Sequence, residues 1–161
     1  MLESFDQMPD TSRLWIYQAE RKLSGSEQDL IRESTSQFLK EWTAHGSNLK
    51  ASFELMHDQF LVLTLDENVS QASGCSIDSS VSHIQGLERS LGISLMNNDK
   101  VAFLIGNEIE LLPAIGLKGR LLEKEVNPST KVFNNTVQNL GDFKSNWFVE
   151  SGKTWVNRFF N

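Results

Sequence analysis

The sequence has little of what cross-links a chain or anchors it in a membrane. It contains one cysteine among 161 residues, so no disulfide can form within the chain, which fits a reducing compartment. No apolar stretch approaches the roughly 20 residues that a membrane-spanning helix needs. The first ten residues contain neither a basic start nor an apolar run. We therefore expect no signal peptide, a cytoplasmic location and no contact with a membrane.

Basic residues form no cluster along the chain, and the formal net charge is −6. A protein with this charge is a poor partner for nucleic acid or for an anionic membrane. The three histidines, His45, His57 and His83, lack the spacing of metal ligands, so we expect no metal site and no cofactor. The remaining partners are a small molecule or another protein, and the sequence leaves a homo-oligomer open.

The apolar pattern predicts an α+β fold with a mainly antiparallel sheet, in one domain over residues 1–161 that starts with a flexible lead-in over 1–12. A chain of this length buries about 70% of its unfolded surface, enough for a core without cross-links. Strands are expected at residues 14–17, 50–56, 60–65, 101–105, 109–112 and 130–133. Helices are expected at residues 24–46, from the loop at 72–79 to Gly92, at 115–125, and on both sides of Gly152. The first six elements follow the split βαβ order of a ferredoxin-like sheet, and an extra hairpin strand and C-terminal helices come after them.

One stretch, SQASGCSIDSSVSHI at residues 70–84, has the composition of a site. It follows a strand that is apolar on both faces and opens an amphipathic helix. The apolar positions of this helix are Ile77, Val81, Ile84, Leu87 and Leu91. Ser73, Ser76 and Asp78 can each cap the helix, because a short side-chain oxygen satisfies the free amides of the first turn. Free amides at a helix start also favour an anion or a thiolate.

The first functional hypothesis is a binding or accessory protein. The loop at 72–79 is then a structural turn or a cradle for a small anion or other ligand. The residues that would form the cradle are Ser73, Gly74, Ser76, Asp78 and Ser79. Cys75 is in this case a buried and inert side chain, because free cysteines are among the most buried residues.

The second hypothesis is a thiol-dependent enzyme or redox-responsive protein with Cys75 as the nucleophile. Asp66 together with His45 or His83 would then supply the base and the group that orients it. This hypothesis requires an accessible sulfur and a histidine within roughly 4 Å of it. A third hypothesis is an interaction module whose aromatic tail binds another protein, which requires exposed Trp155 or Phe159 side chains.

Residues 23–27, LSGSE, resemble the signature loop of ABC transporter ATPases. Such an enzyme also needs a phosphate-binding loop of the form GxxxxGK[ST]. Gly152, Lys153 and Thr154 match the end of that loop, but Trp147 stands where its first glycine is required. We therefore interpret LSGSE as the start of a helix with the spacing of a capping box.

Several stretches together resemble a family of small bacterial proteins that are often labelled ABC transporter ATPase. They are WIYQ at 15–18, EWTAHG at 41–46, LKASFE at 49–54, ASGCSIDSSV at 72–81, KVFNN at 131–135 and the tryptophan-rich tail. The resemblance covers most of the chain, and ASGCSIDSSV is its most specific part. The label requires a phosphate-binding loop that this sequence lacks. The family has no established activity, so the resemblance implies a bacterial, cytoplasmic protein and carries over no functional residue.

Overall fold

The computed structural model describes residues 1–161, and their contacts form two compact units. The first unit comprises Met1–Met96 with Gln138–Gly141, and the second comprises Asn97–Val137 with Asp142–Asn161. Helices and antiparallel sheets occur in the chain as predicted, so the α+β class is confirmed. No helix combines the length and the apolar composition needed to cross a membrane.

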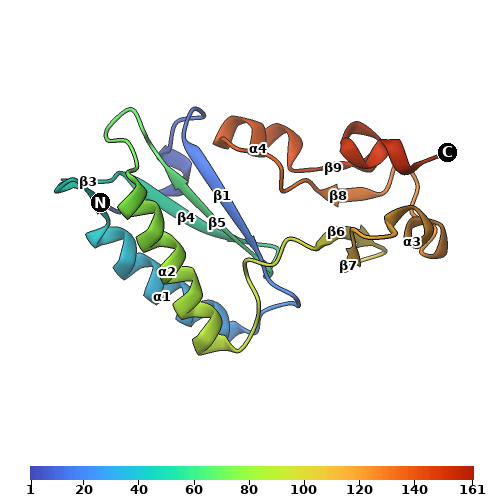
Figure 1. Ribbon diagram of the computed structural model, residues 1–161, viewed down its shortest axis with the longest axis horizontal. Helices are drawn as coiled ribbons and strands as arrows, with labels where there is room; N and C mark the ends of the chain where they lie inside the picture. Colours follow the sequence, from blue (N-terminus) through green and yellow to red (C-terminus); the bar gives the residue numbers. More distant parts are fainter. The chain divides into compact units, whose positions relative to one another are not determined.

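The first unit contains the predicted split βαβ arrangement. Its antiparallel sheet has the order β1-β5-β4, with β1 at Arg13–Gln18, β4 at Ala51–Met56 and β5 at Phe60–Leu65. Two helices, α1 (Gly25–Glu41) and α2 (Gly74–Leu91), lie side by side on one face of this sheet (Figure 1). The smaller elements are the 3-10 helix η1 (Phe5–Gln7) and the short strands β2 (Thr43–Ala44) and β3 (Ser47–Asn48).

The core of the first unit follows from the central position of β5. All six residues of this strand are buried, as its apolar pattern on both faces predicts. Leu61, Leu63 and Leu65 alternate along the strand and belong to the same core cluster as Ile31 of α1 and Ile84 of α2. The sheet and both helices therefore share one apolar core.

Both long helices start where the sequence predicts, and α2 also ends there, but α1 ends at Glu41 rather than at residue 46 because β2 and β3 follow it. Ser24 and Glu27 cap α1 reciprocally, and Ser73 and Ser76 cap α2 in the same way. Gly92 ends α2 in the left-handed conformation, with φ +67°, which glycine adopts without steric cost. These caps place the residue pair Gly74–Cys75 in the first turn of α2.

The predicted flexible lead-in is instead folded against the first unit. Leu2 bridges to Ala51 at the start of β4, and the Glu3 N–H donates to the Ala51 carbonyl at 2.8 Å. Met8 is buried. Residues 1–12 are mostly polar, but the apolar side chains of Leu2 and Met8 give this segment a surface to bury.

Ser12, just before β1, is fully buried, and its hydroxyl has no hydrogen-bond partner. Since an unsatisfied buried hydroxyl costs roughly 1–3 kcal/mol, we expect Ser12→Ala to raise the free energy of unfolding in urea by about 1 kcal/mol. Ser80→Ala is the control, because the buried Ser80 hydroxyl donates to the Ile77 carbonyl at 2.7 Å. This control should lose about 1 kcal/mol. A loss of stability in Ser12→Ala would contradict the expectation.

The second unit is built on a four-stranded antiparallel sheet of order β7-β6-β8-β9. The strands are β6 (Lys100–Ile105), β7 (Glu108–Pro113), β8 (Lys131–Phe133) and β9 (Phe148–Glu150). The helices are α3 (Leu117–Glu123), α4 (Leu140–Asn146), which begins in the first unit, and the 3-10 helices η2 (Ser151–Lys153) and η3 (Trp155–Phe159). A two-residue turn joins β6 to β7, and its first residue, Gly106, has the positive φ of +65° that a type II′ turn requires.

The strand at 100–105 does not join β1, although the ferredoxin-like element order suggests that neighbour. One edge of β6 pairs with β7 through the tight hairpin, and the other edge pairs with β8. Both edges are therefore occupied within the second sheet. The first sheet has three strands for this reason.

The aromatic tail packs on the core of its own unit. That core consists of Phe103, Leu112, Leu117, Leu121, Val126, Val132 and Val156. Trp155, Phe159 and Phe160 are half-buried against it. Strand β9 departs from the expectation for the tail, because the helical spacing of Phe143 and Trp147 favours a helix through this region.

Candidate functional site

Asp66, a candidate base or orienting group, holds the turn that leaves β5. Its side chain is 7% exposed, and Oδ1 accepts a hydrogen bond from the Asn68 N–H at 3.0 Å. Oδ2 lies 3.8 Å from the Lys50 Nζ. Glu67 then closes the loop by accepting from the Ala72 N–H at 3.1 Å. The Asp66 and Glu67 carboxylates therefore both accept hydrogen bonds from backbone amides of this loop.

The serines of the proposed cradle cap the helix themselves. The Ser73 N–H donates to Ser76 Oγ at 2.7 Å, and the Ser76 N–H donates to Ser73 Oγ at 3.1 Å. The Ser79 hydroxyl donates to the Cys75 carbonyl at 3.0 Å. Gly74 and Asp78 are exposed beside them. A bound anion would compete with intramolecular acceptors for the amides of residues 72, 73 and 76.

Cys75 is exposed in the first turn of α2, so the expectation of a buried cysteine is wrong. His83 shares a hydrogen bond of 3.0 Å with Thr35 Oγ1 and stacks on the Phe38 ring at 4.6 Å. His45 occupies the β2–β3 turn with φ +51° and is exposed. The structure thus makes the sulfur accessible, and the hydrogen bond with Thr35 holds the His83 imidazole against α1.

The exposure of Cys75 gives a direct expectation for its reactivity. Iodoacetamide should alkylate Cys75 in the folded protein at a rate within about tenfold of that in the urea-denatured chain. Intact-mass spectrometry over time measures both rates on the single cysteine. Protection of about a hundredfold or more in the folded protein would contradict the exposed placement.

His83 gives the protein an acid-sensitive contact between α1 and α2. Burial lowers the pKa of the His83 imidazole below its usual value of about 6.5. The unfolded chain then binds a proton that the folded protein does not, so the free energy of unfolding should fall as the pH drops below about 6.5. We expect His83→Gln to reduce this loss in urea unfolding curves recorded between about pH 7 and pH 5.

The control for this experiment is Ser82→Ala, on the exposed side of the same helix turn. It should retain the full loss of stability on acidification. An unchanged pH dependence in His83→Gln would show that the acid sensitivity has another origin.

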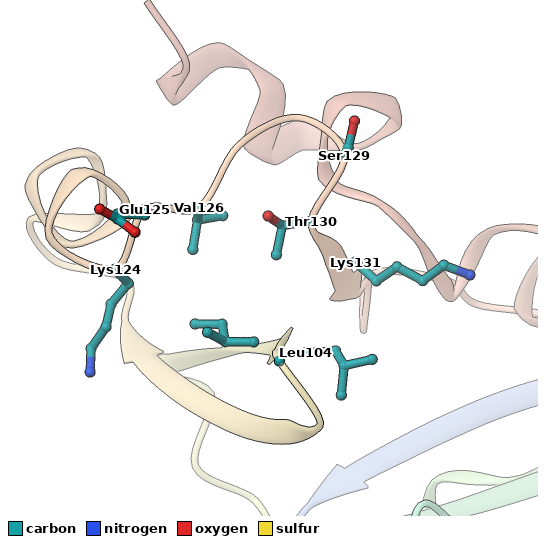
Figure 2. A pocket seen from close by; sticks show the side chains of 9 residues that line it. Leu104, Lys124, Glu125, Val126, Ser129, Thr130 and Lys131 are labelled. Carbon is teal, nitrogen blue, oxygen red and sulfur yellow. The ribbon is translucent and has the colours of Figure 1, made fainter.

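The second unit contains a pocket of about 420 Å³ that no motif in the sequence predicts. The residues that line it are Leu104, Ile105, Gly106, Lys124, Glu125, Val126, Ser129, Thr130 and Lys131. Figure 2 shows the Val126 and Thr130 side chains directed toward the side chains of the β6–β7 hairpin, which include Leu104. The Lys124 and Lys131 side chains extend away from the centre of the pocket (Figure 2). Apolar and polar side chains therefore share the lining of the pocket, and the Lys124 and Lys131 charges lie on its rim.

The pocket opens where two neighbouring strands separate. β6 and β8 pair at one position only, Phe103 with Val132. The residues that follow Phe103 and those that precede Val132 line the pocket on opposite sides. Where the hydrogen-bond ladder between two strands ends early, a wedge-shaped gap is left between the strands. Here Val126, which lies in the connection that follows α3, closes this gap.

Hydrogen bonds fix the wall that faces β6. The Asn127 N–H donates to Thr130 Oγ1 at 3.1 Å, and the Ser129 N–H donates to Asn127 Oδ1 at 2.8 Å. The Ser151 N–H and hydroxyl both donate to the Thr130 carbonyl. Glu125, with φ +56°, follows the end of α3 and turns the chain toward Val126. These bonds hold the wall in one conformation.

The two lysines of the rim differ in their partners. The Lys124 Nζ lies 2.9 Å from Glu110 Oε1. The Lys131 Nζ lies over the Phe148 ring, 4.8 Å from its centroid, and has no carboxylate partner. Of the two lysines, Lys124 is therefore paired with a carboxylate and Lys131 is not, and Glu125 adds a negative charge to the same rim.

Comparison of the chain with protein-family models, with curated proteins and with solved structures found no match. The site must therefore be judged on its own geometry.

Proposed function

We propose that this chain is a bacterial, cytoplasmic binding protein whose ligand site is the pocket between β6 and the connection from α3 to β8. The resemblance to a bacterial family without an assigned activity supports the setting. The observation that carries the site is the pocket of about 420 Å³, which Leu104, Ile105 and Val126 line beside the charged residues of its rim. Binding sites for small groups have this size.

The pocket favours binding over catalysis. Leu104, Ile105 and Val126 have no group that transfers protons or attacks a substrate. The Thr130 Oγ1 accepts from a backbone amide, and Lys124 pairs with Glu110. The function supported best is therefore capture of an apolar group, with orientation supplied by the rim.

Titration of the ¹⁵N-labelled full chain with indole, a small apolar probe, tests this function. Indole should shift the amide signals of residues 104–106 and 124–131 with a dissociation constant on the order of 1 mM. Ile105→Ala, which removes part of the pocket lining, should weaken this binding severalfold. Ile115→Ala is the matched control, because Ile115 is 86% exposed and does not line the pocket.

Equal binding by the two isoleucine variants would contradict the assigned site. The absence of saturable shifts in any of these residues would contradict the proposed function. Circular dichroism spectra of both variants confirm that each is folded before the titration.

A further inference from the structure

Strand β7 lies at one end of the second sheet and pairs with β6 alone. The Ala114 N–H donates to the Asp99 carbonyl at 2.8 Å, which fixes the alternation of hydrogen bonds along the β6–β7 hairpin. The even-numbered residues of β7 therefore direct their backbone groups to β6, while Ile109 and Leu111 direct theirs to the outer side. No other part of the chain forms a backbone hydrogen bond with Ile109 or Leu111 on that side. The outer edge of β7 is therefore a row of unpaired donors and acceptors.

Two charged side chains lie at opposite ends of this outer edge. Glu108 begins β7, and Arg120 of α3 reaches the far end, where its Nε donates to the Ile115 carbonyl at 3.4 Å. Both side chains are exposed, and neither takes part in an ion pair of this chain. Ile115 is 86% exposed. The edge therefore has a negative charge at one end, and a positive charge beside an uncovered aliphatic side chain at the other.

We propose that a second copy of this chain binds the outer edge of β7, so that the two β7 strands pair antiparallel around a two-fold axis. The axis reverses the direction of the second strand. Glu108 of each copy therefore comes to the end of the edge where Arg120 of the other copy lies. Reciprocal ion pairs form, and they use the charges that the single chain leaves unpaired. This self-complementarity favours a second copy over an unrelated strand as the occupant.

The side chains of β7 favour a register centred on Leu111. In this register Leu111 exchanges both backbone hydrogen bonds with Leu111 of the second copy, and the Ile109 N–H donates to the Pro113 carbonyl. The side chains on this face then form apolar pairs. A shift of the axis to Ile109 or Glu110 would place glutamates directly opposite each other. A shift to Leu112 would pair Leu111 with Pro113, which has no N–H to donate in return.

The same register brings the opposite charges together on one face of the joined sheet. Glu108 lies opposite Ala114 of the second copy, close to the Arg120 guanidinium. Glu108 and Leu112 point to the same face of β7, and Leu112 shares a core cluster with residues of α3. Arg120 of α3 is therefore on the face to which Glu108 points. Because edge pairing buries a small area, we expect a weak dimer with a dissociation constant on the order of 100 µM.

Sedimentation velocity of the full chain in low salt, at about 10–500 µM, should show a shift from monomer to dimer. Glu108→Arg and Arg120→Glu should each weaken self-association at least about tenfold, because each places like charges together at both ends of the pairing. An equimolar mixture of these two variants should regain dimers, since the mixed dimer has opposite charges at both ends. Glu33→Arg is the control, because it makes the same charge change at an exposed position of α1 and should leave dimerisation unchanged.

Hydrogen exchange of single amides tests the backbone pairing itself. The Ile109 and Leu111 amides should exchange about threefold faster at about 20 µM than at about 500 µM protein, because only the dimer protects them. The Glu110 and Leu112 amides, which face β6, should be protected equally at both concentrations.

A monomer at all of these concentrations would overturn the proposed dimer. The same conclusion would follow if Glu108→Arg associated as well as the wild type, if Glu33→Arg lost association to the same extent, or if the mixture of variants stayed monomeric. Exchange of Ile109 and Leu111 that does not depend on protein concentration would overturn the pairing through β7.

Discussion

Replacing Gly152 with alanine should lower the free energy of unfolding by about 2–3 kcal/mol. An added Cβ would lie 2.9 Å from the Pro128 Cβ, which is closer than Cβ atoms approach, and 3.2 Å from the Pro128 carbonyl oxygen, which is a tight contact. The Gly152 N–H also donates to that carbonyl at 2.8 Å. Moving the two segments apart would relieve the clash but weaken this hydrogen bond. Urea unfolding followed by tryptophan fluorescence measures the loss.

Gly119→Ala is the matched control for this experiment. Gly119 lies within α3, and a Cβ added there would meet no atom within 4 Å outside its own helix backbone and chain neighbours. Alanine favours a helix over glycine by about 1 kcal/mol, so this variant should be unchanged or more stable. Equal effects of the two substitutions would contradict the close approach at Gly152. Because Pro128 precedes Ser129, Thr130 and Lys131, which line the pocket, Gly152→Ala should also weaken indole binding.

Phe103→Ala should cost about 3–5 kcal/mol of stability. Phe103 is fully buried in the core of that unit and forms the one pair between β6 and β8. Its truncation removes apolar contacts and leaves a cavity that the surrounding strands fill only in part. The same urea unfolding measurement gives the change in free energy.

Phe103→Leu distinguishes the effect of the cavity on stability from the effect of a general loss of structure. It keeps most of the buried volume and should cost less than half as much as the alanine substitution. A loss of less than about 1 kcal/mol in Phe103→Ala would contradict the burial of this ring.

The starts of both long helices and the end of α2 could be predicted from the sequence because the interactions that set them are local. The Ser24–Glu27 spacing specifies a capping box within four residues, and the structure contains both of its hydrogen bonds. Gly92 ends α2 for an equally local reason, since its left-handed conformation suits glycine. The hairpin of β6 and β7 is set by the two residues that join its strands.

The partners of β6 could not be predicted in the same way. Its pairing with β8 joins residues 103 and 132, and no short-range pattern specifies a contact over that distance. Strand β9 escapes prediction because Phe148 and Val149 suit both a strand and an apolar helix face, and pairing with β8 decides between them. Sheet membership is therefore a tertiary property of this chain.

The candidate site around Cys75 also shows that local sequence does not determine tertiary contacts. The serines around Cys75 suit both helix capping and ligand binding. In the structure, Ser73 and Ser76 cap the helix. Cys75 and His83 are linked only by their nearness in sequence, while His83 hydrogen-bonds to Thr35 of α1. The pocket lies in segments 104–106 and 124–131, which share no motif. Gly106 and the Asn127–Pro128 turn are its only visible signals in the sequence.

The most direct test of the binding site is the position of a bound probe. Intermolecular nuclear Overhauser effects between indole protons and the ¹³C-labelled methyl groups of the full chain measure it. We expect contacts with the methyl groups of Ile105, Val126 and Thr130, which line the pocket. Contacts confined to other methyl groups, such as those of the exposed Ile115 and Leu122, would contradict the assignment of this pocket as the binding site.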